Sequence, residues 1–328
     1  MTAQKYLAID IGGSKIMTAI ASVSSKGNRR EAALSAVAKE SLARDAGEQG
    51  ILDTLERLVL QSFAETGTSW LDIAAIGVTI PGVARADDCF WVYAPFSGIG
   101  NFPIGQILRA KYNRPVYGQN DVNACAWAEH LFGVCQDVQD FLWITISNGI
   151  GGGLVLNGQV FPGATGGAAE IGHFQVVPNG ALCGCGRRGC LEAEAAGPAI
   201  ARRCRELLAQ ESNYNFPVPP DQINAALIAD AARGGNPIAL ETYRQTGHLL
   251  GHACALAANL INPAKIVFGG GVIGAFDLFR PQLEKTFFDE VFLSVNRHVT
   301  LEATGLGYEA GLLGALACAF GREDASQQ

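Results

Sequence analysis

Four side chains that bind metals well lie close together in the sequence, between positions 173 and 190. They are His173, Cys183, Cys185 and Cys190. Three thiolates and one imidazole make a complete tetrahedral set for Zn²⁺, and a closed set of this kind leaves no coordination position open for a substrate. The glycines between the cysteines let the backbone turn tightly around an ion. The spacing therefore predicts a zinc knuckle with a structural metal.

Two acidic residues flank the predicted knuckle. Glu170 comes three residues before His173, and Glu192 comes two residues after Cys190. A bound ion would hold both carboxylates in a fixed place, where they could bind a polar ligand. Two alternatives stay open: the close cysteines are redox or packing residues, or the knuckle is a free-standing recognition module.

Three glycine-rich turns follow apolar strands, at residues 10–15, 147–153 and 269–271. Backbone N–H groups without a Cβ beside them are suited to binding phosphate. Each turn alone is weak evidence, because a tight hairpin needs glycine whether or not anything binds. A Walker loop is excluded because Ile16 follows Lys15, and the dinucleotide fingerprint fails because its third glycine would fall at Leu154.

Asn120 and Asp121 come just after a predicted strand at residues 115–118. This position places an acid at the carboxyl end of a strand, where α/β folds often carry functional groups. The alternative interpretation is an N-cap for the helix predicted at about 122–133. Both interpretations hold together if one residue caps the helix while the other faces a ligand.

The predicted elements show the same plan twice, because strand, glycine turn and strand occur near the N-terminus and again from residue 141. Predicted helices separate the strands at about 46–66, 122–133, 221–232, 238–261 and 308–320, and a Gly- and Pro-rich loop is expected at 94–105. We therefore expect a duplicated two-domain α/β fold with a ligand-binding cleft between the domains. The expected domains are 1–119, with the C-terminal helix 309–328 packing back on it, and 120–308, which carries the zinc site and the nucleotide-binding elements.

Composition narrows the class of protein. The chain has 328 residues, 48% of them hydrophobic, which is enough for two cores. A net charge of −7 with scattered Lys and Arg predicts no nucleic-acid partner. The cysteines outside the knuckle lie in apolar stretches typical of reduced core thiols, and no signal peptide or membrane span is recognisable. We expect a cytoplasmic protein.

Taken together, the motifs resemble those of the ROK family, which groups repressors, open reading frames and sugar kinases on the actin/hexokinase/Hsp70 (ribonuclease H-like) fold. The matching motifs are D-I-G-G-S-K (10–15), N-D-V-N-A (120–124), N-G-I-G-G-G (148–153), E-I-G-H (170–173), C-G-C-G-R-R-G-C-L-E (183–192) and F-G-G-G-V (268–272). They run in the expected order over nearly the whole chain, and the pair E-I-G-H and C-G-C-G-R-R-G-C-L-E is the most specific.

The resemblance implies a kinase that uses ATP, Mg²⁺ and a structural Zn²⁺. The residues implied for nucleotide binding are Asp10, Gly12, Gly13, Ser14, Lys15, Asn148, Gly149, Gly151, Gly152, Gly270 and Gly271. The residues implied for sugar binding are Asn120, Asp121, Glu170, His173 and Glu192. Asp121 would accept the proton of a hexose 6-hydroxyl as this attacks the γ-phosphoryl group of ATP, and Asp10 would help to hold Mg²⁺.

The substrate is less well defined by the resemblance. Glu170 stands where some N-acetylmannosamine kinases carry His, which favours glucose over N-acetylglucosamine, N-acetylmannosamine or another hexose. Pro95 and Ile99 depart from the Asn and Trp of many relatives, and polyphosphate remains open as a donor. Two other classes are a sugar-sensing transcriptional regulator, for which the strand at Lys5 leaves no room for a DNA-binding module, and a catalytically silent sugar-binding protein. A homodimer is expected from the relatives.

Overall fold

The computed structural model describes residues 4–43, 45–94, 98–211 and 216–327, with side chains described up to residue 321. Pro95 lies outside the described residues, whereas Ile99 begins a strand. The chain folds as two compact units. Unit 1 consists of Met1–Gln139, Gly153–Ala168 and Gly305–Gln328, and unit 2 consists of Asp140–Gly152 and Ala169–Thr304.

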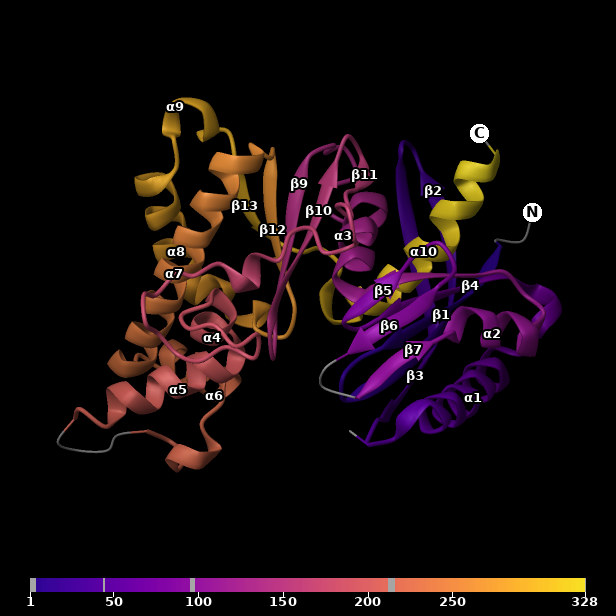
Figure 1. Ribbon diagram of the computed structural model, residues 1–328, viewed down its shortest axis with the longest axis horizontal. Helices are drawn as coiled ribbons and strands as arrows, with labels where there is room; N and C mark the ends of the chain where they lie inside the picture. Colours follow the sequence, from indigo (N-terminus) through magenta and orange to yellow (C-terminus); the bar gives the residue numbers. More distant parts are fainter. Residues whose placement is uncertain (1–3, 44, 95–97, 212–215, 328) are drawn as a thin grey trace. The chain divides into compact units, whose positions relative to one another are not determined.

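Unit 1 contains a mixed sheet with helices on both faces (Figure 1). Its strands are β1 (Lys5–Ile11), β2 (Lys15–Lys26), β3 (Arg29–Ser41), β4 (Ile73–Ile80), β5 (Val83–Arg85), β6 (Phe90–Ala94), β7 (Ile99–Phe102), β8 (Val116–Asn120) and β11 (Gln159–Val160). Its helices are α1 (Gly47–Thr66), α2 (Ile104–Tyr112), α3 (Asp121–Phe132) and α10 (Ala310–Gln327), with 3₁₀ turns η1 (Trp70–Asp72) and η5 (Gly307–Glu309). The strand order of the main sheet is β3-β2-β1-β4-β8.

The two faces of this sheet bury alternate residues of β1. Leu7, Ile9 and Ile11 pack in one core with α1 and α2, and Tyr6 and Ala8 pack in a second core with α10. This alternation is the period-2 pattern of a strand that is covered on both faces. It explains why the first strand is apolar at nearly every position.

The C-terminal helix α10 lies very close to the sheet of unit 1. Gly77, in β4, allows this approach, because a Cβ there would lie 1.7 Å from the carbonyl oxygen of Ala315. Gly314 in turn faces α3, where an added Cβ would lie 3.0 Å from the carbonyl carbon of Ala124. Small residues at the contact thus let α10 pack against both the sheet and α3.

Unit 2 contains strands β9 (Phe141–Ile146), β12 (Lys265–Gly269) and β13 (Thr300–Ala303), and β10 (Ile150–Leu156) begins in this unit. Its helices are α4 (Leu191–Ala195), α5 (Gly197–Leu208), α6 (Ala225–Arg233), α7 (Pro237–Ile261), α8 (Phe276–Glu290) and α9 (Leu293–Asn296). The 3₁₀ turns are η2 (Ile171–His173), η3 (Pro220–Gln222) and η4 (Ile273–Ala275). The strand order of the second sheet is β11-β10-β9-β12-β13.

The two five-stranded sheets repeat one plan, as the sequence predicted. In the first, β1 pairs with β2 antiparallel and with β4 parallel, and β4 pairs with β8 parallel. In the second, β9 pairs with β12 parallel and β12 pairs with β13 parallel, and the hairpin strand β10 follows β9. Each sheet therefore begins with a hairpin and continues with parallel strands reached by helical crossovers.

The division into units differs from the predicted boundary between residues 119 and 120. Helix α3 belongs to unit 1 because it packs against α10, and Gly153 meets Val122 and Ala126 of α3 when a Cβ is added. The Gly- and Pro-rich segment predicted as a loop also carries β7, which joins β5 and β6 in a small antiparallel sheet. Both differences, the unit boundary and the extra strand, come from tertiary packing. The N-cap at Asn120 and the Gly and Pro residues of the loop do not reveal this packing.

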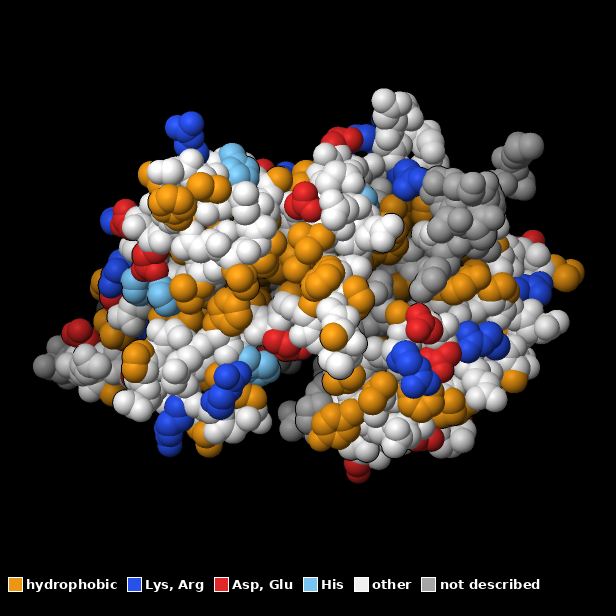
Figure 2. All heavy atoms as spheres, turned by 45° about the horizontal axis from the view of Figure 1, so that its top comes forward, with side chains coloured by type: hydrophobic (Ala, Val, Ile, Leu, Met, Phe, Trp, Pro, Cys, Tyr) orange, Lys and Arg blue, Asp and Glu red, His pale blue; other side chains and the backbone are white. Residues whose placement is uncertain are grey.

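The surface is mixed in charge on the face drawn in Figure 2. Lys and Arg side chains of the described residues occur there singly or in small groups beside Asp and Glu, without a continuous basic area. Among the described parts of the chain, every helix is too short or too polar to pass through a lipid bilayer.

Candidate active site and metal centre

The first glycine turn closes between β1 and β2. The N–H of Gly12 donates to the carbonyl oxygen of Lys15 at 2.9 Å, so Gly13 and Ser14 form an exposed tip. Asp10, near the end of β1, accepts a hydrogen bond from the Thr79 hydroxyl at 2.6 Å, and Thr79 is its register partner on β4. The predicted β-hairpin is thus present, with an acid held beside it.

Gly311, in the first turn of α10, leaves space for the Asp10 carboxylate. A Cβ at this position would lie 2.4 Å from Asp10 Oδ2, so a larger residue would displace the acid. Neither Thr79 nor Gly311 was predicted from the sequence. The role of Thr79 depends on the strand register that places it beside Asp10. The role of Gly311 depends on α10 packing against the sheet.

Asn120 is the N-cap of α3, and its side chain is fully engaged. Its Oδ1 accepts from the N–H groups of Val122 and Asn123, each at 3.0 Å, and its Nδ2 donates to the Gly82 carbonyl at 2.8 Å and to Asp121 Oδ1 at 3.0 Å. Two lone pairs and two N–H donors are all that an amide offers. The capping interpretation of this residue is therefore the one the structure shows, and Asn120 also orients its acidic neighbour.

Asp121 is held through one carboxylate oxygen. Oδ1 accepts from the Val122 N–H at 2.9 Å and from Asn120, while Oδ2 has no hydrogen-bond partner among the described residues. Burial, and second the negative charge of Asp10, raise the pKa of Asp121 to about 7, although the hydrogen bonds from Val122 and Asn120 oppose the rise. Burial also raises the pKa of Asp10. Asp121 is thus an acid with one free oxygen that titrates near neutrality.

The second glycine turn and the third lie against each other in unit 2. The N–H of Ser147 donates to the Gly149 carbonyl at 2.9 Å, and the Ser147 carbonyl accepts from the Gly197 N–H at 2.8 Å. Gly270 has φ +89° and would clash with Ile146 if it carried a Cβ, and a Cβ on Gly271 would lie 3.3 Å from the Ser147 hydroxyl. These turns therefore need glycine, and they bring Asn148, Gly149, Gly270 and Gly271 together. Gly151 and Gly152 continue into β10, where Gly152 fits against Ala169.

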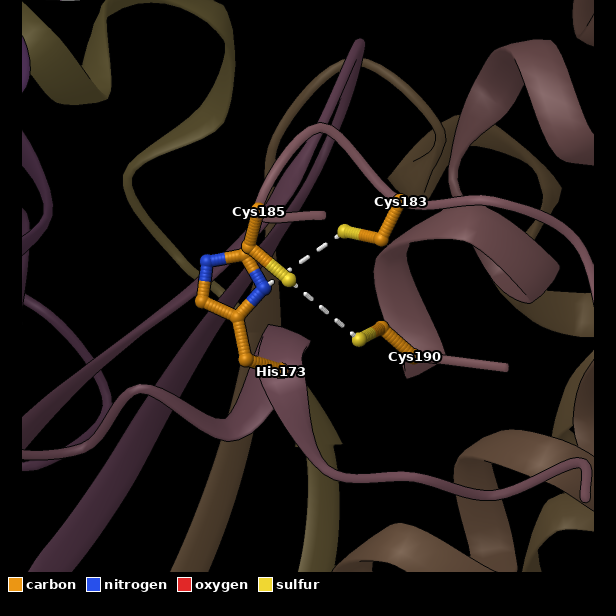
Figure 3. A group of neighbouring side chains, drawn as sticks. All are labelled: His173, Cys183, Cys185 and Cys190. Carbon is orange, nitrogen blue, oxygen red and sulfur yellow. Dashed lines mark hydrogen bonds between the residues drawn. The ribbon is translucent and has the colours of Figure 1, made fainter. Parts of the chain in front are cut away.

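The four predicted zinc ligands converge in unit 2 (Figure 3). Their ligand atoms all lie within 4.8 Å of one another, with Cys183 Sγ 3.7 Å from His173 Nδ1 and Cys185 Sγ 3.6 Å from Cys190 Sγ. A tetrahedron with Zn–S bonds of about 2.3 Å has edges of about 3.8 Å. The donor atoms are thus of the right type, number and spacing for a closed zinc site.

The backbone around these ligands is a tight turn that requires its glycines. The N–H of Cys183 donates to the Arg187 carbonyl at 2.8 Å, and Gly186 and Gly189 have φ of +87° and +74°. A Cβ on Gly189 would lie 1.7 Å from the Val177 carbonyl oxygen. Cys183 and Cys190 are buried, whereas Cys185 is exposed. The fold itself therefore holds the four side chains close together.

Both carboxylates predicted beside the knuckle are near it. Glu170 Oε2 lies 3.9 Å from His173 Nε2, so the imidazole faces the cysteines with Nδ1 and the acid with Nε2. Glu192 Oε1 lies 3.7 Å from Cys183 Sγ, and its Oε2 accepts the Ile150 N–H at 3.0 Å. A Cβ on Gly149 would lie 2.5 Å from Glu192 Oε2, so the second hairpin and this acid are in close contact. Asn148 and Glu192 line one cavity of about 370 Å³ together with Cys183 and Arg202.

Glu194 is a buried acid that the sequence did not single out. It is 5% exposed, and its Oε1 accepts the Ala181 N–H at 2.6 Å, just before the cysteine loop. Its Oε2 lies 3.1 Å from Arg202 Nη2 and 3.6 Å from Arg203 Nη2, on α5. The carboxylate therefore ties the ligand loop to a helix.

The predicted site residues thus fall into two groups, each assembled within one unit. Unit 1 holds Asp10, the hairpin Gly12 to Lys15, Asn120 and Asp121, and unit 2 holds Asn148 to Gly152, Gly270, Gly271, Glu170, Glu192 and the four zinc ligands. In chemical terms, unit 1 supplies two acids and a glycine turn of the type that binds phosphate. Unit 2 supplies two further glycine turns and two acids beside the candidate metal site.

Known proteins resemble this chain over nearly its full length. The sequence model of the ROK family matches residues 6–321. The chain is 30% identical to the glucokinase of Streptomyces coelicolor over 94% of this chain and 95% of that protein. It is 35% identical to the N-acetylglucosamine repressor of Escherichia coli O157:H7 over 70% of this chain, and the match spans only 57% of the repressor's length.

Among solved structures, a ROK family glucokinase from Streptomyces griseus in complex with glucose and AMPPNP superimposes with a TM-score of 0.80 at 29% identity, covering 97% of this chain and 99% of that one. The α/β fold with two mixed sheets is thus the actin-like ATPase fold of the ROK glucokinases. The family match, the shared fold and the cysteine–histidine knuckle agree, and the chain belongs to the ROK family.

Proposed function

We propose that this protein is an ATP-dependent hexokinase that phosphorylates the 6-hydroxyl group of glucose. The observation that carries the proposal is Asp121, a partly accessible acid with one free carboxylate oxygen and a pKa raised to about 7. A general base works best when its pKa lies close to the working pH. The 29–30% identity to glucokinases over 94–97% of the chain supports the same activity.

In the proposed reaction, the oxygen of the sugar 6-hydroxyl attacks the γ-phosphorus of ATP and the bond from phosphorus to the leaving ADP oxygen breaks. Asp121 Oδ2 accepts the hydroxyl proton, while Asn120 and the Val122 N–H keep Oδ1 in place. Asp10 and Thr79 lie beside the hairpin, where Asp10 would hold Mg²⁺. The ion, when bound, neutralises charge on the phosphates.

The residues of unit 2 would serve the other parts of the two substrates. Glu170, His173 and Glu192 are proposed to bind sugar hydroxyls, because the knuckle fixes these side chains and leaves His173 Nε2 turned away from the cysteines. The turns at Asn148 to Gly152 and at Gly270 and Gly271 are proposed to bind the nucleotide through backbone N–H groups. A structural zinc ion in the knuckle would keep the acids in position.

Glucose is the proposed acceptor because Glu170 stands at a position where some N-acetylmannosamine kinases carry His. N-acetylmannosamine is the alternative that lies within the kinase class. N-acetylglucosamine is a further candidate because of the 35% identity to a repressor named for that sugar. The same identity supports the alternative from another class, a sugar-sensing regulator that binds a sugar without phosphorylating it. A homodimer is proposed because dimers are common among members of the family.

A coupled assay of ADP formation tests these alternatives together. The acceptors are glucose, N-acetylglucosamine, N-acetylmannosamine, fructose and allose, with ATP and with polyphosphate as donors. We expect the highest kcat/KM with glucose and ATP, rising with pH to a plateau above about pH 7 as Asp121 loses its proton. Calorimetric sugar binding without turnover on any acceptor would reject the kinase and support the regulator.

A further inference from the structure

Tyr308 is an exposed aromatic residue that holds a lysine of the first glycine turn. It lies on η5, directly before α10, and it is 71% exposed. Lys15, the residue that ends the turn and begins β2, donates from Nζ to the Tyr308 hydroxyl at 2.6 Å. The same ammonium group lies 4.2 Å from the centroid of the tyrosine ring. The Lys15 ammonium group therefore lies against the tyrosine ring and is hydrogen-bonded to its hydroxyl group.

A second cation lies close to the same ring. Lys39 Nζ is 5.9 Å from the Tyr308 centroid, and Lys39, in the neighbouring strand β3, pairs with Met17. Within the described part of the chain, neither ammonium group is within ion-pair distance of a carboxylate. Two unneutralised cations beside one ring are unexpected in a chain with a net charge of −7. Such cations can attract an anionic ligand, because no carboxylate of the described residues forms an ion pair with them.

Lys15 and Tyr308 lie close enough to Asp10, one of the two acids of the proposed site, for their charges to interact. The charge of Lys15 opposes the rise in the pKa of Asp10, and Asp10 in turn raises the pKa of Asp121. The hydrogen bond from Lys15 and the charges of Lys15 and Lys39 lower the pKa of Tyr308, whereas the charge of Asp10 acts in the opposite direction. Lys15 and Tyr308 are thus at the end of the hairpin where phosphoryl transfer is proposed.

We propose that Tyr308 is a positioning residue that holds Lys15 ready to bind the terminal phosphate of the triphosphate donor, with Lys39 as a second cation. A free lysine side chain has many rotamers, and restricting them before the ligand arrives lowers the entropic cost of binding. The inference rests on the proposed kinase function and adds to it. Tyr308 touches neither the sugar nor the transferred group in this proposal.

Steady-state kinetics with ATP and glucose separate the two contributions of Tyr308. Tyr308→Phe keeps the ring and loses the hydroxyl group, while Tyr308→Leu loses both. We expect KM for ATP to rise about twofold in the first variant and about two- to fivefold in the second, with KM for glucose unchanged. Lys26→Met, which removes a surface charge at the far end of β2, is the control and should leave both constants unchanged.

A double-mutant cycle tests whether Tyr308 acts through Lys15. In Lys15→Met, the further change Tyr308→Leu should raise KM for ATP by less than twofold, because the side chain that Tyr308 positions is already gone. Full multiplication of the two effects would overturn the proposal. Equal loss of affinity for ATP and ADP, measured by calorimetry, would also overturn it, since a terminal-phosphate contact requires the larger loss for ATP.

A spectroscopic measurement keeps this inference separable from the kinase function. In protein labelled with ¹³C-tyrosine, the Tyr308 ring should titrate below the other exposed tyrosines, and Lys15→Met should remove that difference. If the wild-type protein phosphorylates no sugar, the kinase proposal fails, whereas calorimetric ATP and ADP binding still tests Tyr308. If the protein is an active kinase, but Tyr308→Leu leaves KM for ATP unchanged and Lys15→Met leaves the Tyr308 titration unchanged, only the inference about Tyr308 fails.

Discussion

At the scale of single residues, the two acids Asp10 and Asp121 both have a raised pKa. Both side chains are partly buried in unit 1, and the charge of Asp10 adds to the raised pKa of Asp121. Two like charges in such a place cannot both ionise without cost. This is the arrangement that a general base near neutral pH needs, and it also destabilises the folded protein when no ligand is bound.

The pH dependence of stability follows from the direction of the Asp121 shift. The folded protein keeps a proton on Asp121 up to about pH 7, whereas the unfolded chain releases it near the ordinary aspartate pKa of 3.8. The free energy of unfolding due to this group therefore falls as pH rises between these values and changes no further above about pH 7. Asp121→Asn removes that loss.

We therefore predict that Asp121→Asn is more stable than the wild type at pH 8 and equally stable at pH 4, in buffer without Mg²⁺ or nucleotide. The gain should be on the order of 1–2 kcal/mol, discounted for the partial exposure of the side chain. Thermal melts at both pH values measure it, with Asp53→Asn on the exposed face of α1 as the matched control. A variant that is less stable than the wild type at pH 8 would refute the raised pKa.

At the scale of elements, the zinc knuckle was predicted from the sequence because its ligands are close together in the chain. His173 and the three cysteines converge as the spacing indicated, and the glycines adopt the positive φ that the turn requires. Glu194 could not be predicted in the same way, because its role depends on Arg202 and Arg203 from the next helix. Likewise, Tyr308 and Gly311 reach Lys15 and Asp10 only because α10 returns to the first sheet.

Removal of zinc should affect sugar binding together with stability. We predict that a chelator lowers Tm and weakens glucose binding about tenfold or more, because Glu170 and Glu192 lose their fixed positions. Metal content and calorimetric glucose affinity measure this, and Cys185→Ala should behave like the chelated protein. Cys254→Ala, a buried thiol in α7, is the control and should keep its zinc.

The buried acid Glu194 provides a second arm of this experiment. Glu194→Gln leaves two arginines without their carboxylate and loosens the loop that begins at Ala181. It should therefore release zinc to the chelator faster than the wild type. A chelated protein with unchanged glucose affinity would show that the metal does not position the acids.

At the scale of the whole molecule, duplication is the feature that the sequence indicated most directly. Strand, glycine turn and strand occur twice in the chain, and each forms the start of a five-stranded sheet. The helices at 47–66 and 237–261 lie close to their predicted limits, because their apolar periodicity is long and regular. Strands β3 and β7 were not predicted, since their pattern is polar on one side or interrupted by turn residues.

The boundary between the two units could not be predicted from the sequence, because it depends on how the helices pack. Asn120 and Asp121 gave a correct signal for the start of α3, but the packing of α3 against α10 decides the unit to which it belongs. The family match covers residues of both units.

The central claim is that Asp121 is the base of a hexose phosphotransferase. Its most direct test is kcat for glucose and ATP in Asp121→Asn, with glucose affinity measured on the same preparation. We predict that kcat falls by about 10²–10⁴-fold, while glucose binding and the folded structure are retained and Asp53→Asn keeps the wild-type kcat. A kcat for Asp121→Asn near that of the wild type would contradict the account.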